Sequence, residues 1–333
     1  MCLRFGFNPL RSRRSVNGMM NCQDFKIVVL CGAQSPEREV SIRSGKACAE
    51  SLRMRFPETE LRVLEENLLP ADLDPNRDII FPVIHGDYGE DGGIQRDLEA
   101  RGFAYAGCDA ASSEVCIDKA ITKERLRECG VPVADDVSFY ADCLPSAASL
   151  IARLGEAVVV KPADKGSSVG LFLPTGEAEI QRVLDGDLSA AKKWIAESRL
   201  VGRELTVGLL GGKAMGIVEI RPKAGVYDFT NKYTSGNTDY LFPAPIDAES
   251  TEKIKAAAER LFKACACRDF ARADVILQAD ASFYFLEVNT MPGLTATSLL
   301  PKSASCIGLD FEALTAAMIA PAIGRFRSGF AGA

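Results

Sequence analysis

The sequence predicts an α/β domain followed by two α+β pieces, and three patterns in the chain lead to this fold class. Residues 25–31 (FKIVVLC) and 78–84 (DIIFPVI) are short, almost wholly apolar runs, which are typical of buried strands. A turn and a helix to about Arg53 lie between them, and connections of this length favour a parallel sheet. Farther along, residues 205–220 and 273–289 each have the pattern of a β-hairpin.

The helices and strands between these segments can be placed from residues typical of helix ends and from strand composition. The helix DKAITKERLREC is predicted to begin after Asp118, a good N-cap residue, and to stop at Gly130. VPVADD (131–136) and AVVVKPA (157–163) have the composition of strands.

The later elements follow the same logic. The first hairpin is predicted to turn at Gly211 and Gly212, and the second near Asp280. Ser250 is predicted to cap the long helix TEKIKAAAERLFKACA. One face of that helix carries four small or apolar residues: Ile254, Ala258, Leu261 and Cys265.

Length and charge exclude several classes of protein. A chain of 333 residues is too long for one ordinary core, so two or three domains are expected. Its formal charge of −6 argues against nucleic acid as a partner. No stretch of about 18 uncharged apolar residues occurs, so no membrane span and no membrane partner are expected.

The cysteines and the first 24 residues carry little functional signal. The 11 cysteines include no CxxC pair, and with one histidine a zinc site is not expected. We interpret them as reduced thiols in an intracellular protein. Residues 1–24 are rich in arginine, and we expect a leader without fixed structure, with a targeting segment as the alternative.

The segment VVVKPADKGSSVG at 158–170 joins a strand that delivers Lys161 to a loop rich in glycine and serine. Glycines let backbone N–H groups approach phosphate oxygens, and a lysine neutralises phosphate charge. The Walker pattern GxxxxGK[ST] is absent. The segment therefore indicates either a phosphate-binding loop or a lysine that ends an edge strand beside a turn.

Four polar residues gather on the last predicted hairpin. Asp274 lies on one strand, and Glu287 and Asn289 lie two residues apart on the other, so the pair faces one side of the sheet. Oxygen ligands on one sheet face suit Mg²⁺. Arg272 shares the face of Asp274 and can stabilise charge on a transferring phosphoryl group. The alternative is a solvent-exposed face with ion pairs, which the apolar run FYFLEVN disfavours.

Two further segments suggest ligand contacts. His85, the only histidine in the chain, follows the second buried strand in VIHGDYGEDGGIQ (83–95), and ligands gather where parallel strands end. It is either a core histidine at a strand end or a ligand contact. In NTMPGLTATSLLPKSA (289–304), a predicted helix start near Ser298 is either a carboxylate site or a simple cap.

Together these segments resemble the D-alanine–D-alanine ligases of the ATP-grasp superfamily. The matching segments occur in family order: GAQSPEREVS, HGDYGEDGGIQ, VVVKPADKGSSVG, KYTS at the ω-loop, RADV and LEVNTMPG. The resemblance runs from about Lys26 to Ile319.

The resemblance implies a three-domain ATP-grasp fold with ATP between the last two domains. The implied parts are the leader 1–24, an N-terminal parallel α/β domain 25–107, a central subdomain 108–201 and a C-terminal subdomain 202–333. It also implies a cytoplasmic enzyme, usually a homodimer, that joins two D-alanine molecules through an acyl phosphate for peptidoglycan synthesis. Its implied cofactors are ATP and two Mg²⁺ (or Mn²⁺) ions.

Roles for nine residues at the nucleotide follow from the resemblance. The implied ATP contacts are Lys119, Lys161 and Lys232 at the phosphates, Glu197 and Leu200 at the adenine, and Glu204 at the ribose. Asp274, Glu287 and Asn289 are implied to hold the two metal ions, with Glu287 bridging them.

Roles at the two amino acids are implied in the same way. The implied contacts are Glu37 at the first ammonium, His85 beside the first carboxylate, Arg272 and the Gly293 backbone at the tetrahedral charge, and Ser298 and Leu299 at the second carboxylate. Ser167 and Tyr233 are implied to join Glu37 in a network that holds the ω-loop shut. His85 is expected to position substrate as a cation or hydrogen-bond donor rather than to act as a base.

The chain departs from the family pattern at Arg96, Asp269, Phe270 and Phe285. Asp269 can change the pairing of the nearby Arg272, so it bears most directly on the geometry of the metal site. Two alternatives stay open: a ligase for another second substrate such as D-serine, and an ATP-binding protein without catalysis. The presence of all the implied metal ligands and phosphate lysines disfavours the second.

Overall fold

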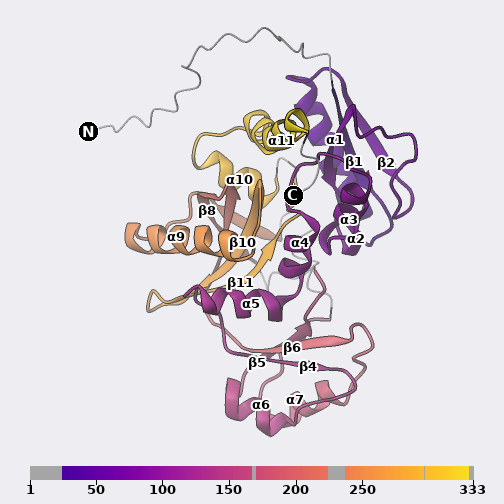
Figure 1. The fold of residues 1–333 in the computed structure, drawn as a ribbon. Helices are drawn as coiled ribbons and strands as arrows, with labels where there is room; N and C mark the ends of the chain where they lie inside the picture. The colour runs from indigo at the N-terminus through magenta and orange to yellow at the C-terminus, as the bar shows by residue number, and fades with distance from the viewer. Residues whose placement is uncertain (1–24, 167–169, 224–236, 296, 330–333) are drawn as a thin grey trace.

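The fold is that of a computed structural model, which describes residues 25–166, 170–223, 237–295 and 297–329. The described strands form three sheets. In Figure 1 the N-terminal sheet lies at the upper right, a five-stranded sheet at the centre and a small sheet at the bottom.

The first sheet is parallel, with the strand order β2-β1-β3. Its strands are β1 (Lys26–Gly32), β2 (Thr59–Leu64) and β3 (Asp78–Val83), and α1 (Arg38–Arg53) follows β1. The two predicted strands, the helix after the first and their parallel pairing are confirmed. β2 is absent from the prediction because its sequence TELRVL mixes charged and apolar residues, as an edge strand can.

Helices cover both faces of this sheet. Ile27 and Val29 of β1 share a core with α1 and with α11 (Phe311–Ser328), the last helix of the chain. Val28 and Leu30 face the opposite side and pack with α3 (Gly93–Ala100). Burial on both faces is the reason why these strands are apolar without alternation.

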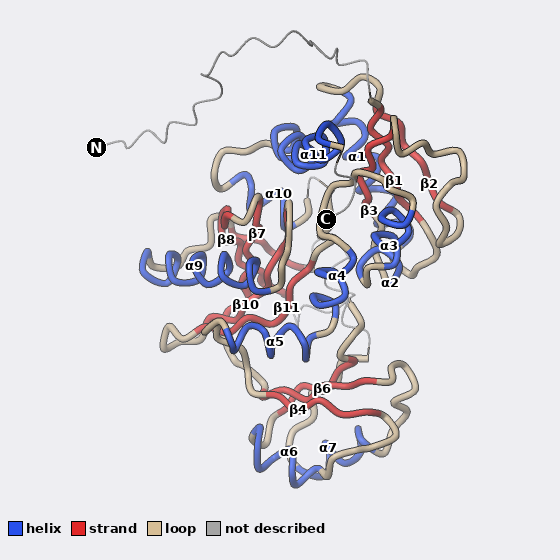
Figure 2. Tube along the Cα trace, in the orientation of Figure 1, coloured by secondary structure: helices blue, strands red, loops and turns tan. Residues whose placement is uncertain are grey.

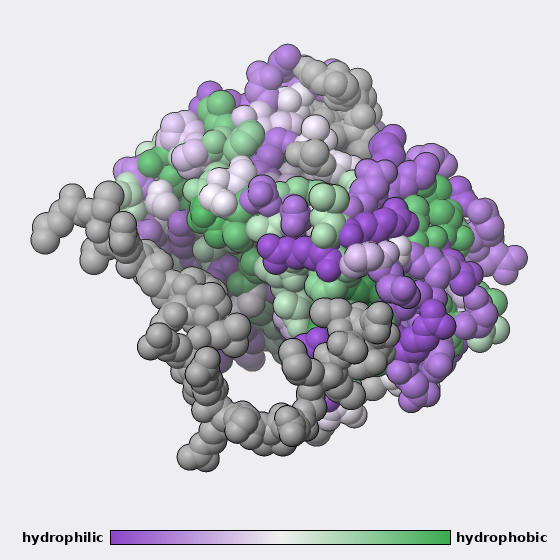
Figure 3. Space-filling model, turned by 90° about the horizontal axis from the view of Figure 1, so that it is seen from above, coloured by the Kyte–Doolittle hydropathy of each residue, from purple (hydrophilic) through white to green (hydrophobic). Residues whose placement is uncertain are grey.

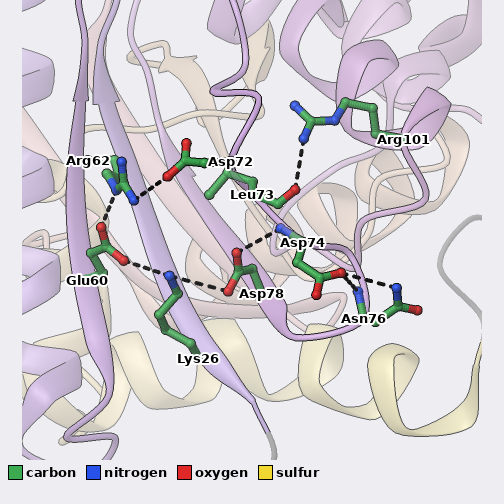
Figure 4. Close-up of polar contacts among 9 residues, drawn as sticks. All are labelled: Lys26, Glu60, Arg62, Asp72, Leu73, Asp74, Asn76, Asp78 and Arg101. Atoms are coloured by element: carbon green, nitrogen blue, oxygen red, sulfur yellow. Dashed lines mark hydrogen bonds and ion pairs between the residues drawn. The ribbon is translucent and has the colours of Figure 1, made fainter.

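The amino ends of the three strands carry a network of charges (Figure 4). The Lys26 ammonium on β1 lies 2.7 Å from the Glu60 carboxylate on β2 and 3.4 Å from the Asp78 carboxylate on β3. Arg62 pairs with Glu60 and, at 2.8 Å, with Asp72. The charged side chains at the amino ends of the strands are therefore occupied by ion pairs with one another. The loops that follow the carboxyl ends of β1 and β3 are the expected place for a ligand site.

The small sheet is antiparallel, in the order β4-β6-β5. Its strands are β4 (Asp136–Tyr140), β5 (Val158–Pro162) and β6 (Lys193–Ser198). Helices α6 (Ala147–Leu154) and α7 (Glu177–Leu184) cover it, as Figure 2 shows, and their apolar residues surround Trp194.

The predicted strand at 157–163 is confirmed, but the one at 131–136 is largely wrong. β4 begins only at Asp136, and Val133 makes a single bridge to Phe285. Pro132 has no N–H to donate and offers only its carbonyl, to the Phe285 N–H at 2.9 Å, so a regular ladder cannot run through it.

The central sheet contains both predicted hairpins, in the order β11-β10-β7-β8-β9. Its strands are β7 (Arg203–Leu210), β8 (Lys213–Pro222), β9 (Thr238–Leu241), β10 (Phe270–Leu277) and β11 (Phe283–Asn289). Gly211 and Gly212 turn the first hairpin with positive φ angles of 57° and 75°. Only glycine adopts such a pair without strain.

Helices lie on both faces of the central sheet. The predicted apolar face of α9 (Ala248–Ala264) is buried in its core. Ser250 is not the cap of α9, because Asp247 begins the helix and its carboxylate accepts the Ser250 N–H at 2.8 Å. On the other side α10 (Leu299–Ser305) contacts β7 and β8, where Gly208 donates its N–H to the Ser303 hydroxyl.

Two helices, α4 (Ala110–Ile117) and α5 (Lys119–Glu128), connect the first sheet to the rest. The Asp118 carboxylate accepts two N–H groups at the start of α5, and Gly130 follows its end with φ of 65°, so both predicted end signals are confirmed. Cys116 and Leu126 pack into the core of the central sheet. The domain boundaries at 107/108 and 201/202 stay a prediction.

The Asp269 carboxylate joins three separate parts of the chain. It accepts hydrogen bonds from both terminal nitrogens of Arg325 on α11, and a third from the Gly107 N–H at 2.9 Å. Arg325 also donates to the Tyr105 carbonyl at 2.7 Å. Asp269 therefore pairs with α11 and with the end of the N-terminal part, whereas Arg272 donates to Asp274.

The polarity of the surface varies across the face seen in Figure 3. In Figure 3 hydrophilic residues dominate one side of the view, with smaller hydrophobic areas between them. Of the helices in the described ranges, none is long and apolar enough to span a membrane.

The Asp269 junction predicts a large loss of stability for Asp269→Asn. The variant keeps the size of the side chain and its tolerance of a positive φ, but it leaves the Arg325 guanidinium without a counter-charge in a buried place. We expect the free energy of unfolding, measured by chemical denaturation, to fall by about 2–4 kcal/mol. Glu259→Gln, which removes one partner of an exposed pair with Lys213, should change it by less than about 1 kcal/mol. Equal effects of the two substitutions would contradict this role for Asp269.

Candidate active site

A cavity of about 680 Å³ lies where the first sheet, the central sheet and the start of α5 meet. This volume is within the usual range for small-molecule sites. Nine of the predicted site residues line it: Glu37, His85, Lys119, Arg272, Glu287, Asn289, Gly293, Ser298 and Leu299. Segments that are far apart in the sequence therefore converge on one cavity.

Two glycines in the loop after β3 lie where a side chain would clash with the protein or strain the backbone. At Gly89 an added Cβ atom would lie 1.8 Å from the Ile84 carbonyl oxygen, and Gly86 has a φ of 91°. The Ser35 hydroxyl, from the loop after β1, donates to the His85 carbonyl at 2.8 Å. The glycine-rich run thus folds this loop against its own strand and against the neighbouring loop.

His85 is buried and also lines the cavity, so the core position is confirmed and the ligand contact stays a prediction. Its Nε2 lies 3.4 Å from the Ser44 hydroxyl, and its Nδ1 lies 4.0 Å from the Glu90 carboxylate. Burial lowers the pKa of His85, and the opposing effect of the Glu37 carboxylate does not overcome it. A neutral hydrogen-bonding histidine fits better than the positioning cation that was the other expectation.

Two acidic side chains form one wall of the cavity. Glu37 precedes α1 without capping it through its side chain, and its carboxylate is directed to the site rather than to the helix end. Glu90, in α2 (Asp87–Glu90), lines the same wall. Burial and the nearby Glu37 carboxylate raise the pKa of Glu90 to about 8. Glu90 had no predicted role, although it lies inside the matched motif HGDYGEDGGIQ.

The β10–β11 hairpin supplies the opposite wall, and its register places the predicted residues as a group. Asp274 lies directly across from Glu287, and Arg272 directly across from Asn289. The Arg272 guanidinium donates to both oxygens of Asp274, at 2.9 and 2.8 Å. Thr206 on β7 donates a further hydrogen bond to Asp274 at 2.5 Å. The same-face prediction is confirmed, and Arg272 is held rigidly by the carboxylate beside it.

This donor set suits a hard divalent cation. Glu287 and Asn289 present oxygens at the cavity, and the oxygens of Asp274 lie behind them, bound by Arg272 and Thr206. No three His, Cys, Asp or Glu side chains converge within the described ranges. A cation here therefore needs the Asn289 amide oxygen beside the two carboxylates, a combination of oxygens that Mg²⁺ accepts.

Lys119 is the buried cation that faces these acids. Its ammonium lies 3.8 Å from the Glu287 carboxylate and donates to the Lys165 carbonyl at 2.7 Å. Burial lowers its pKa, and the charge of Glu287 opposes that effect. Because the Asp118 cap fixes the start of α5, the first side chain of the helix points at the cavity with little freedom.

Five predicted residues lie outside the cavity lining: Lys161, Glu197, Leu200, Glu204 and Asp274. Lys161 on β5 pairs with Glu197 on β6 at 2.6 Å, beneath α5. Leu200 lies in the connection from β6 to β7, and Glu204 is the second residue of β7. The residues assigned to the base and ribose of ATP are thus placed along the link between the small and the central sheet.

The segment after β11 provides the remaining wall. Ser298 is the N-cap residue of α10, but its hydroxyl accepts the Thr295 N–H at 3.0 Å rather than a helix N–H. A Cβ atom added to Gly293 would lie 3.0 Å from that hydroxyl, so glycine keeps the turn close. Lys302 also lines the cavity, and its ammonium lies 4.7 Å from the centre of the Tyr240 ring. No role was predicted for Lys302.

Three predicted residues, Ser167, Lys232 and Tyr233, lie outside the described ranges, so the ω-loop network stays a prediction. Of the departures from the family pattern, Arg96 pairs at the surface with Glu114, and Phe285 is buried against Phe283. Neither side chain lines the cavity.

Comparison with known proteins gives one consistent result. A family model described as "D-ala D-ala ligase C-terminus" matches residues 126–320. A D-alanine–D-alanine ligase from Thermotoga maritima is 37% identical over 295 residues, covering 87% of this chain and 94% of that protein.

Solved structures agree with the sequence matches. The ATP complex of a D-alanine–D-alanine ligase from Bacillus anthracis superposes with a TM-score of 0.80 at 29% identity, covering 91% of this chain and 99% of that one. The D-Ala:D-Ser ligase VanG from Enterococcus faecalis superposes with a TM-score of 0.78 at 28% identity, covering 90% and 100%.

The raised pKa of Glu90 predicts how stability depends on pH. The folded chain keeps the Glu90 proton up to about pH 8, whereas an unfolded glutamate loses it near its ordinary value of 4.5. This stabilising contribution is complete below about pH 4.5 and is lost as the pH rises through about 8. For the ligand-free protein, the free energy of unfolding should fall by up to about 1.4 kcal/mol per pH unit between pH 6 and 8 on account of this group.

The matched variant is Glu90→Gln, which stays neutral at every pH. Its unfolding free energy should show a clearly shallower decline between pH 6 and 8 than that of the unchanged protein. If both proteins had the same slope, Glu90 would be ionised in the folded state and the inference would be wrong.

Proposed function

The chain belongs to the D-alanine–D-alanine ligase family, and from this we propose that its cavity joins two D-alanine molecules with ATP, for peptidoglycan synthesis. The products are D-alanyl-D-alanine, ADP and phosphate. The fold is that of the ATP-grasp ligases. One observation carries the proposal: a single cavity gathers Glu37 and His85 from the N-terminal part, Lys119 from α5, and Arg272 and Glu287 from the central sheet.

The first D-alanine binds between the acidic wall and the histidine. Glu37 pairs with its ammonium, and His85 donates a hydrogen bond to its carboxylate. Because both side chains are buried and come from loops that are hydrogen-bonded to each other, they hold the substrate in one orientation.

A carboxylate is a poor electrophile, since attack on it must expel oxide, and ATP removes this obstacle. An oxygen of the first carboxylate attacks the γ-phosphorus of ATP, the bond to the β-phosphate oxygen breaks, and ADP leaves. The amine of the second D-alanine, as the free base, then attacks the acyl carbon, its nitrogen loses one proton to solvent, and phosphate leaves with the bonding electrons of the C–O bond.

Charge is the main difficulty of the first step, because a carboxylate approaches a polyanion. Lys119 and Lys161 neutralise phosphate charge, and Arg272 stabilises the negative oxygen that develops in both steps. Asp274, Glu287 and Asn289 hold Mg²⁺ or Mn²⁺, which neutralises phosphate charge when bound. The Gly293 backbone shares the tetrahedral charge with Arg272, and Ser298 and Leu299 receive the second carboxylate.

The remaining assignments are supported by resemblance alone. Glu197 and Leu200 border the adenine, Glu204 the ribose, and Lys232 the terminal phosphates. Ser167 and Tyr233 close the ω-loop with Glu37, which protects the acyl phosphate from water. We place the enzyme in the cytoplasm, where ATP is available, and expect a homodimer.

The direct test supplies ATP and Mg²⁺ with D-alanine, D-serine or D-lactate as second substrate, and detects phosphate and the coupled product. We expect D-alanyl-D-alanine as the main product, with one phosphate released per dipeptide. Preferred coupling to D-serine would assign the chain to the specificity of VanG. Phosphate release that does not depend on any D-amino acid would remove the ligase assignment.

Glu287→Gln tests the metal assignment. It removes one charge from the proposed cation site and keeps the shape of the side chain, so kcat should fall at least about a hundredfold while the circular dichroism spectrum is unchanged. Glu259→Gln, on an exposed pair distant from the cavity, is the control and should retain full activity. Near-normal turnover of Glu287→Gln would refute the metal role of this residue.

A further inference from the structure

Lys123 is a buried lysine without a place in the proposed reaction. It lies one turn after Lys119 on α5, is 1% exposed, and donates to the Ala134 carbonyl at 3.2 Å. Its ammonium also forms an ion pair with Oε1 of Glu197. The other oxygen of that carboxylate, Oε2, lies 2.6 Å from the ammonium of Lys161. One carboxylate thus lies between two ammonium groups that come from different elements.

This cluster carries one more positive than negative charge. The two lysines contribute two charges and Glu197 only one, and the side chain of Glu197 is 4% exposed. Burial opposes its ionisation, but the charges of Lys161 and Lys123 outweigh that and lower its pKa to about 2. Beyond these direct contacts, Asp136 also acts on both lysines and Glu287 on Lys161, so the excess is local to the contacts with Glu197.

The two lysines are not equivalent. Lys161 is 16% exposed and lies on β5, just before the glycine-rich loop, whereas Lys123 on α5 is buried and donates to the Ala134 carbonyl. Among the described residues, Oε1 of Glu197 has no hydrogen-bond partner. The positive charge of Lys123 therefore balances the negative charge of this buried oxygen through an ion pair. Losing that pair would leave Lys161 as the nearest cation for the whole buried carboxylate.

We propose that Lys123 is a positioning residue that keeps Glu197 compensated while Lys161 turns from that carboxylate to a phosphate of the bound nucleotide. The inference rests on the proposed function, which assigns Lys161 to ATP. With Lys123 in place, ATP competes for Lys161 against a carboxylate that already has a second cation. Without Lys123, ATP must break a buried one-to-one ion pair, which costs far more.

The test uses the full-length enzyme and steady-state kinetics with each substrate varied in turn, together with ADP binding by calorimetry. For Lys123→Gln, which keeps a hydrogen-bond donor but no charge, we expect the KM for ATP and the Kd for ADP to rise about tenfold or more. The KM for D-alanine should change less than about twofold. Lys123→Arg should restore most of the nucleotide affinity. Lys213→Met, which removes a lysine from an exposed pair, is the control.

A double variant separates positioning from simple structural support. Because Glu197 is itself assigned to the adenine, Lys123→Gln/Glu197→Gln is compared with Glu197→Gln alone: without the carboxylate that holds Lys161, Lys123→Gln should weaken ADP binding far less than it does in the unchanged enzyme. A purely structural role predicts the same loss of ADP affinity in both backgrounds, and that result would overturn the inference. An unchanged KM for ATP in Lys123→Gln with a native circular dichroism spectrum would overturn it as well.

Lys161→Met keeps this inference distinct from the proposed function. If Lys161→Met weakens ADP binding and Lys123→Gln does not, only the role of Lys123 fails. If Lys161→Met leaves ADP binding unchanged, the assignment of Lys161 to ATP fails first. If Lys123→Gln does not fold, the comparison of Lys123→Arg with the unchanged enzyme decides, since a preserved charge must preserve the Kd for ADP within about threefold.

Discussion

The Asp269 carboxylate is a buried contact that joins three parts of the chain around the cavity. It holds α11 through Arg325 and the end of the N-terminal part through the Gly107 N–H, and Asp269 directly precedes the strand that carries Arg272 and Asp274. The cavity has walls from both sides of this junction, and the shared core of α1 and α11 and the hydrogen bond from the Leu294 N–H to the Ser44 hydroxyl join the same sides. The position has a φ of 58°, at which aspartate is tolerated better than most residues. A residue that departs from the family pattern thus has a structural role.

The second constraint is electrostatic. Buried acids and buried cations line the cavity or lie behind its walls, and several of them pair with one another in the absence of ligand. Asp274 is bound by Arg272, Glu287 lies near Lys119, and Glu197 lies between two lysines. Burial, and after it the charge of Glu37, raise the pKa of Glu90 to about 8, which favours its neutral form near pH 7. Such preformed pairs are poised to exchange partners when ATP and amino acids arrive, which is what a ligase for like-charged substrates requires.

Much of this arrangement could be predicted from the sequence. Almost wholly apolar runs indicated β1 and β3, the paired glycines indicated the turn between β7 and β8, and period-two spacing placed Glu287 and Asn289 on one face. The sequence could not decide between neighbouring residues that are equally suited to the same structural role. Asp247 and Ser250 are both good caps, and only the folded chain shows that the aspartate begins α9. β2 was missed because an edge strand needs only one apolar face.

The residues that sequence reasoning missed owe their roles to contacts across the fold. Glu90 and Lys123 are ordinary charged residues in the chain, and their importance comes from burial and from partners that are distant in sequence. Glu197 is 74 positions after Lys123 and pairs with it because α5 lies over the small sheet. No local pattern indicates such a pairing. The spacing of Lys119 and Lys123, four residues apart on one helix face, was the available signal.

The central claim is that the cavity activates the first amino acid as an acyl phosphate before the second one attacks. The most direct measurement supplies D-alanine labelled with ¹⁸O in its carboxylate and analyses the released phosphate by mass spectrometry. The account predicts one ¹⁸O atom in each phosphate, because a carboxylate oxygen stays with phosphorus when the amine displaces it. Phosphate without label, formed together with dipeptide, would contradict it.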